Sequence, residues 1–113
     1  MTPLYDLTLL KTNAGGDAVF VREIITMFKD SGHDNLNILE KNCIDGPCHD
    51  WVEAAHSLKG GAAMMGAEAL RKTAADAQNA SDTSASERSR MYQMMHDLYT
   101  EICTALRSEG LLD

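Results

Sequence analysis

The chain has 113 residues, of which 17 are acidic and 10 basic, giving a formal net charge of −7. This length predicts a single domain over residues 1–113. The acidic balance argues against a nucleic-acid partner, because affinity for phosphate backbones depends on clustered lysine and arginine. No apolar run approaches the roughly 20 residues of a membrane-spanning helix, so we expect no membrane partner either.

Two features of the sequence bear on where the protein works. The first residues contain neither a basic segment nor an apolar segment, so no secretory signal is predicted. The three cysteines are an odd number, which is typical of reduced thiols and not of a disulfide framework. We therefore expect a cytoplasmic protein.

The first predicted element is a short helix. Alanine, leucine and methionine are plentiful and only two prolines occur, a composition that favours helices throughout the chain. Thr2 and Pro3 suit the cap and the first residue of a helix that ends near Thr12. Residues 13–16, which are rich in glycine, then break this helix.

Asp17 is predicted to cap a long second helix that ends near Asn42. Gly32, in the middle of this segment, allows a bend or a break. Residues at helical spacing predict one buried stripe along the helix. This stripe comprises Phe20, Ile24, Met27, Phe28, Ser31, Ile38 and Leu39.

Three further helices are predicted. The third covers about residues 47–65, with a proline in its first turn, and the fourth covers about residues 67–79. Ser84 and Glu87 form a capping box for the last helix, which ends near Ser108. Four long amphipathic helices with short connections predict an all-α fold, an antiparallel four-helix bundle with the short leading helix as a cover.

The third helix has two distinct sides when it is drawn at 100° per residue. Its core side gathers Trp51, Ala54, Leu58, Gly61, Ala62 and Met65. His56 falls almost opposite this side. The pattern therefore predicts an exposed imidazole on a rigid helix.

The residues next to His56 suit the acceptance of a phosphoryl group. An imidazole has an ordinary pKa of about 6.5, so near pH 7 much of it is neutral and nucleophilic. Gly60 lies one turn along the same side, where glycine costs a helix about 1 kcal/mol relative to alanine. We interpret Gly60 as space for an approaching protein. Lys59 adds a positive charge that would offset the charge of phosphoryl oxygens.

This part of the chain resembles the signature of histidine-containing phosphotransfer (HPt) domains, on the pattern His56-x-Leu58-Lys59-Gly60-x5-Gly66. The preceding helix is also similar to that family, on the pattern Asp17-x2-Phe20-x3-Ile24-x3-Phe28. The resemblance covers most of the chain, and the last helix matches only in its apolar pattern.

The resemblance implies a phosphorelay intermediate. His56 would accept a phosphoryl group from the aspartyl phosphate of a receiver domain in a hybrid histidine kinase. It would then pass that group to the receiver domain of a response regulator. Lys59 would stabilise charge, Gly60 would give steric access, and Gly66 would turn the chain into the next helix. The protein would be a phosphocarrier without ATP-dependent kinase activity. It would bind no cofactor itself, and the receiver would bring Mg²⁺.

Docking on a receiver needs a surface around the histidine. Val52, Ala63 and Met64 flank His56 on the helical wheel and form a small apolar patch, although Met64 fits the edge of the core equally well. His49 and Glu53 would add a polar rim. We expect the protein to act as a monomer.

Two other interpretations compete with this one. The chain could be a helical interaction module that binds a receiver or another signalling protein without carrying phosphate, but such a module would be free to lose His56. Cys43, Cys48 and His49 could suggest a zinc site. Zinc sites usually pair their cysteines more closely and supply a fourth ligand, so we predict no metal site.

Overall fold

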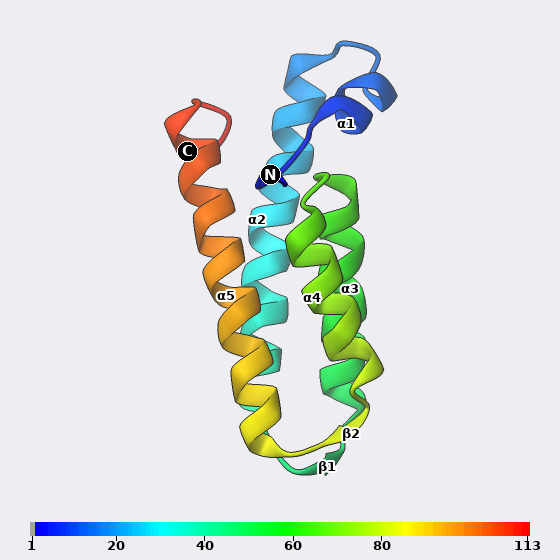
Figure 1. Cartoon of the computed structure of the whole chain (residues 1–113). Coiled ribbons are helices and arrows are strands. Elements are labelled where there is room, and N and C mark those ends of the chain that lie inside the picture. The colour runs from blue at the N-terminus through cyan, green and yellow to red at the C-terminus, as the bar shows by residue number, and fades with distance from the viewer. Residues whose placement is uncertain (1) are drawn as a thin grey trace.

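The structure, a computed structural model, describes residues 2–113. Its main elements are four long helices: α2 (Ala18–Lys41), α3 (His49–Met64), α4 (Glu68–Asn79) and α5 (Ala85–Ser108). Consecutive helices run in opposite directions and pack side by side, and α5 closes the ring against α2 (Figure 1). The predicted all-α antiparallel four-helix bundle is confirmed. No helix in residues 2–113 is long and apolar enough to cross a membrane.

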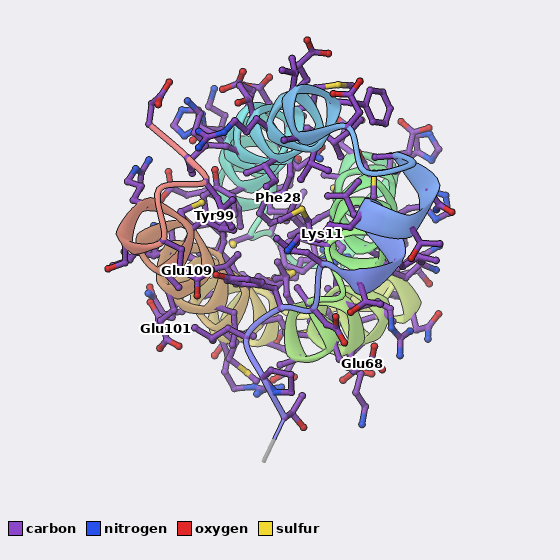
Figure 2. The ribbon with its side chains drawn as sticks, turned by 90° about the horizontal axis from the view of Figure 1, so that it is seen from above. Lys11, Phe28, Glu68, Tyr99, Glu101 and Glu109 are labelled. Carbon is purple, nitrogen blue, oxygen red and sulfur yellow. The ribbon has the colours of Figure 1, made fainter. Side chains whose placement is uncertain are left out.

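The interior of this ring is filled by large side chains from every long helix. Figure 2, a view along the bundle, shows the four helices around a packed centre, with Phe28 and Tyr99 directed inward from α2 and α5. Their ring centroids are 5.7 Å apart. The largest fully buried apolar side chains are Trp51, Ile25, Leu39, Leu58, Met65, Leu70, Met95, Ile102 and Leu106.

Helix α1 (Thr8–Asn13) lies over one end of the bundle and buries Leu10 (Figure 1). The prediction that it begins at Pro3 is wrong. The backbone N–H of Asp6 donates to the carbonyl of Met65 at 3.1 Å, so this segment pairs with the connection between α3 and α4. The side chain of Asp6 then accepts a hydrogen bond from the backbone N–H of Thr8 at 3.0 Å, which starts the helix there.

Helix α2 runs without a break through Gly32. A Cβ atom at residue 32 would lie only 2.5 Å from Cε2 of Tyr99 on α5. The glycine is therefore required by close packing between two helices, and it does not mark the bend that the sequence allows.

The predicted buried stripe of α2 is wrong for several of its members. Phe20, Met27 and Ile38 have exposed fractions of 42%, 63% and 41%, and Ser31 is also exposed. The residues that face the core are Val21, Ile25, Phe28, Gly32, Asn35, Leu36 and Leu39. Helix α2 therefore carries a second apolar face, which is directed to solvent.

The far end of the bundle is closed by a short two-stranded sheet, in which β1 (Gly46–Pro47) pairs antiparallel with β2 (Asp82–Thr83). This pairing holds Pro47 in extended backbone. Helix α3 consequently begins at His49, two residues later than predicted.

Arg88 forms hydrogen bonds to both connections at this end, the one between α2 and α3 and the one between α4 and α5. Its side chain is fully buried and donates hydrogen bonds to the carbonyl of Ile44, at 2.6 Å, and to that of Ser81, at 3.2 Å. Its guanidinium carbon also lies 5.5 Å from the ring centroid of Trp51. Two carbonyls and an aromatic face thus replace part of the water around the charge, while Nε of Arg88 is buried without a hydrogen-bond partner.

Candidate functional site

Helix α3 holds His56 in a fixed position on the bundle. The other side of this helix is buried through Trp51, Ala54, Ala55, Leu58 and Ala62. Trp51 also donates its indole N–H to the carbonyl of Ala77 on α4 at 2.8 Å. His56 faces away from these contacts, and its side chain is exposed to solvent.

The imidazole of His56 is open to a second protein. Its ring nitrogens have no hydrogen-bond or ion-pair partner within residues 2–113. One turn along the helix, a Cβ atom at Gly60 would meet no atom within 4 Å. A partner can therefore approach the ring over residue 60 without displacing a side chain of this chain.

Lys59 is the cation nearest to His56 along the helix. Its side chain is half-buried, and no carboxylate of the described residues lies within 4 Å of its ammonium group. Because residues three apart share one side of a helix, the ammonium group of Lys59 can stabilise a negative charge next to His56.

The five predicted docking residues lie on α3 or at its start. His49 and Glu53 are both exposed, and Nε2 of His49 lies 3.2 Å from Oε1 of Glu53, so these two side chains contact each other. Val52 is half-buried and Ala63 is exposed. Met64 has an exposed fraction of 49%, which places it on the surface and not at the edge of the core.

Sequence reasoning missed the contribution of α2 to this surface. Between α2 and α3 lies a cleft of about 190 Å³, which we call the α2–α3 cleft. Its apolar lining includes Ile24, Met27, Phe28, Gly61 and Met64. It is smaller than the roughly 300 Å³ at which small-molecule sites begin, and so it suits one or two side chains of a partner. The exposed Met27 was assigned to the core stripe, because hydrophobicity alone does not separate a core face from a docking face.

A second, more open depression continues along the same two helices and reaches the histidine. His56, Ser57 and Val52 line it from α3, and Asn35, Ile38 and Lys41 line it from α2. Asn35 and Ser57 line both hollows. The surface around His56 is therefore continuous with the α2–α3 cleft.

The two remaining glycines of the motif region have packing roles. A Cβ atom at Gly61 would lie 3.5 Å from Cδ1 of Phe28, so this residue lets α2 and α3 come close together. Gly66 has φ +60° and follows the end of α3, and a Cβ atom there would lie 2.2 Å from the carbonyl oxygen of Asp6. Only glycine combines this backbone angle with so close a contact.

Comparison with family models places this sequence in a known family. The family model of the Hpt domain matches residues 23–109, which include α3 and most of the bundle. The chain belongs to the Hpt domain family. No curated protein and no solved structure matches it significantly. Hpt domains serve histidine phosphotransfer in two-component phosphorelays, as phosphocarrier modules that interact with receiver domains.

Within residues 2–113, no group of three or more histidine, cysteine, aspartate or glutamate side chains is arranged to hold a metal ion. Cys43 and Cys48 are half-buried free thiols.

Proposed function

We propose that His56 accepts a phosphoryl group from the aspartyl phosphate of one receiver domain and passes it to the aspartate of another. The observation that carries this proposal is the exposed, unpartnered imidazole on α3 beside the open space at Gly60. Family membership supports the general role, and the position of His56 in the family's motif supports the choice of residue.

The reaction is a displacement at phosphorus. A ring nitrogen of His56 attacks the phosphorus atom, and a nitrogen–phosphorus bond forms as the bond to the aspartate oxygen breaks. The aspartate leaves as a carboxylate, and the proton on the other ring nitrogen stays in place. The second transfer is the reverse of this step on another receiver. Phosphoryl transfer depends mainly on positioning and on charge neutralisation, so a rigid helix with one open imidazole suits it.

Two neighbours of His56 have roles in the proposed transfer. Lys59 would offset the negative charge of the phosphoryl oxygens, which supports both transfer directions equally. Gly60 would leave room for the receiver. The receiver would bring the Mg²⁺ ion, and this chain would contribute neither a metal site nor a nucleotide site.

The docking surface of the proposal spans both α2 and α3. On α3 it contains the predicted residues His49, Val52, Glu53, Ala63 and Met64. On α2 it gains the exposed side chain of Met27. Met27 and Met64 line the same α2–α3 cleft, and this supports the extension of the docking surface to α2.

The test is label transfer from a receiver. We would incubate the protein with receiver domains carrying ³²P on their aspartate, in the presence of Mg²⁺, and follow acid-labile, alkali-stable label on the Hpt chain. We expect label on the wild type and on His33→Gln, which changes an exposed histidine of α2, and none on His56→Gln. Label that persists on His56→Gln would overturn the assignment.

The same experiment identifies the partners. Transfer of label from each of a panel of receiver domains to this chain, and from the labelled chain to each receiver, is measured at short times. The fastest donor and the fastest acceptor are the cognate pair. Receiver binding without any transfer to the wild type would support the alternative, a helical interaction module that carries no phosphate.

A further inference from the structure

A small polar network lies beside His56 and has no part in the mechanism above. The side-chain amide of Asn35, on α2, donates to Oγ of Ser57 on α3 at 2.9 Å. The same amide nitrogen donates to Oγ of Ser31, one turn earlier on α2, at 3.3 Å. Asn35 is buried, with an exposed fraction of 8%, whereas both serines are exposed.

The direction of these bonds follows from the donor atom, because an amide nitrogen donates hydrogen bonds and does not accept them. An asparagine amide nitrogen carries two hydrogens, and here both are used. Each serine oxygen therefore accepts a bond from within the protein and keeps its own hydrogen to donate. Among the residues that the structure describes, neither hydroxyl donates to an acceptor, whereas Thr12 and Thr73 each donate to the carbonyl four residues earlier in their helix.

The free hydroxyl of Ser57 lies on the surface that a partner of His56 would cover. Ser57 follows His56 directly in α3, and it lines both the α2–α3 cleft and the depression that contains His56. When a partner covers a hydrogen-bond donor, the donor loses its bound water. If the partner offers no acceptor, the free-energy cost of this desolvation exceeds the net free energy that a hydrogen bond would contribute. A partner that covers the cleft therefore binds better when it places a hydrogen-bond acceptor opposite the hydroxyl of Ser57.

We propose that Ser57 is a specificity-determining contact, whose hydroxyl donates to a hydrogen-bond acceptor on the receiver that docks over His56. Asn35 is the positioning residue, since its amide holds the serine oxygen and leaves the serine hydrogen directed outward. The inference rests on the proposed function, and it adds the chemistry by which partners are told apart. A receiver with a carbonyl or carboxylate oxygen opposite Ser57 docks well, and one with an apolar group there docks poorly.

The occupant is the receiver, because the cleft is continuous with the surface of His56. Asn35 and Ser57 line both hollows, so a domain that covers the imidazole also covers the serine. The apolar lining of the cleft then supplies contact area, and Ser57 supplies a polar point within it.

The first test separates binding from chemistry. We would measure transfer from the ³²P-labelled receiver selected by the profiling above, over a range of receiver concentrations. For Ser57→Ala we expect KM to rise about three- to tenfold, the size of one lost hydrogen bond, with the transfer rate at saturation unchanged. Ser57→Thr keeps the hydroxyl and should restore a near wild-type KM. Ser89→Ala, an exposed serine on α5, is the matched control and should leave KM unchanged.

The second test reverses the hydrogen bond. In Asn35→Asp the carboxylate can only accept, so the hydroxyl of Ser57 turns inward to donate to it and is lost to the partner. We expect a rise in KM similar to that of Ser57→Ala. The double variant should show little more than either single change, because both act through the same hydroxyl.

The outcomes distinguish this inference from the proposed function. A wild-type protein that takes up no label from any receiver contradicts the proposed function. A wild type that takes up label, with an unchanged KM for Ser57→Ala, contradicts only the role of Ser57. Additive effects of the two substitutions would mean that the new carboxylate acts by its charge, and they would also overturn the inference. Circular dichroism and thermal melting check that each variant is folded. If Asn35→Asp does not fold, the KM values of Ser57→Ala and Ser57→Thr alone test the role of Ser57.

Discussion

Gly60 occupies a helical position that alanine would fill without a clash. A Cβ atom there meets nothing within 4 Å, and glycine in a helix interior costs about 1 kcal/mol relative to alanine. Gly60→Ala should therefore raise the free energy of unfolding by about 1 kcal/mol, measured by urea denaturation. Gly32→Ala is the matched comparison. It should destabilise the protein, because its Cβ would lie 2.5 Å from Tyr99. A less stable Gly60→Ala variant would show that the glycine is kept for the fold.

A long side chain at the same residue should instead affect docking. Gly60→Gln places an amide beside the imidazole of His56, so we expect slower phosphoryl uptake from a receiver and a folded, stable bundle. Phosphoramidate, a small donor that needs no docking surface, should still phosphorylate the variant as fast as the wild type. Equal receiver affinity for Gly60→Gln and wild type would refute the steric role of the glycine.

Lys59 has no acidic partner within 4 Å among residues 2–113, so removing its charge leaves no buried carboxylate behind. Lys59→Ala should slow transfer at saturating receiver by about tenfold, equivalent to about 1.4 kcal/mol of lost transition-state stabilisation. The melting temperature should change little. Lys72→Ala, an exposed lysine on α4, is the control for a general effect of net charge. An unchanged transfer rate in Lys59→Ala would remove this residue from the mechanism.

At the scale of elements, α3 was predicted well and α2 poorly, and the difference has a physical cause. The core residues of helix α3 gather on one side and His56 lies opposite them, so a helical wheel separates the core of this helix from His56. Helix α2 has two apolar sides, one against the core through Val21 and Ile25 and one exposed through Phe20 and Met27. Apolar residues at helical spacing do not show which side the other helices cover. The distinction comes only from the packing of α3 and α5 against α2.

The start of α2 offers a prediction for the element as a whole. The side chain of Asp17 accepts hydrogen bonds from the backbone N–H groups of Val19 and Phe20, at 3.0 and 3.1 Å. Asp17→Ala leaves both donors without this partner and should lower the free energy of unfolding by about 1 kcal/mol. Asp17→Asn keeps the capping oxygen and should lose much less. Equal losses in the two variants, measured by urea denaturation, would attribute the effect to charge and not to the cap.

For the whole molecule, the sequence predicted the bundle, its helix order and the exposure of His56, because these depend on local periodicity and on capping residues. It did not predict the network that joins Asn35 to Ser57. These residues are 22 positions apart in the chain, and their contact depends on how α2 is rotated against α3. The late start of α1 was missed for the same reason, since the carbonyl of Met65 that pairs with Asp6 belongs to a distant segment. Pairings between distant segments leave no periodic trace in a single sequence.

The stability of the whole bundle should fall in alkaline solution. Burial, reinforced by Glu109, raises the pKa of Tyr5 to about 12. Burial, together with Cys103, raises the pKa of Tyr99 as well. In the unfolded chain both phenols ionise near pH 10, so the folded state holds more protons above that pH. The contribution of Tyr5 to stability is therefore complete below pH 10 and is lost as the pH rises through about 12, its folded pKa. The contribution of Tyr99 is likewise complete below pH 10 and is lost at higher pH.

Denaturant unfolding between pH 8 and pH 12 measures this loss. The free energy of unfolding of the wild type should begin to decline near pH 9, where the thiol of Cys103 ionises in the unfolded chain while burial raises its pKa in the folded state. It should decline further above pH 10, where the tyrosines contribute. Tyr99→Phe removes one of the ionising phenols together with its hydrogen bond to the carbonyl of Lys29. That variant should be less stable than the wild type at pH 8 and should lose less stability per pH unit above pH 10. A wild-type curve that is flat to pH 12 would contradict the raised pKa of Tyr5. Parallel curves for the two proteins would mean that Tyr99 ionises equally in the folded and unfolded states.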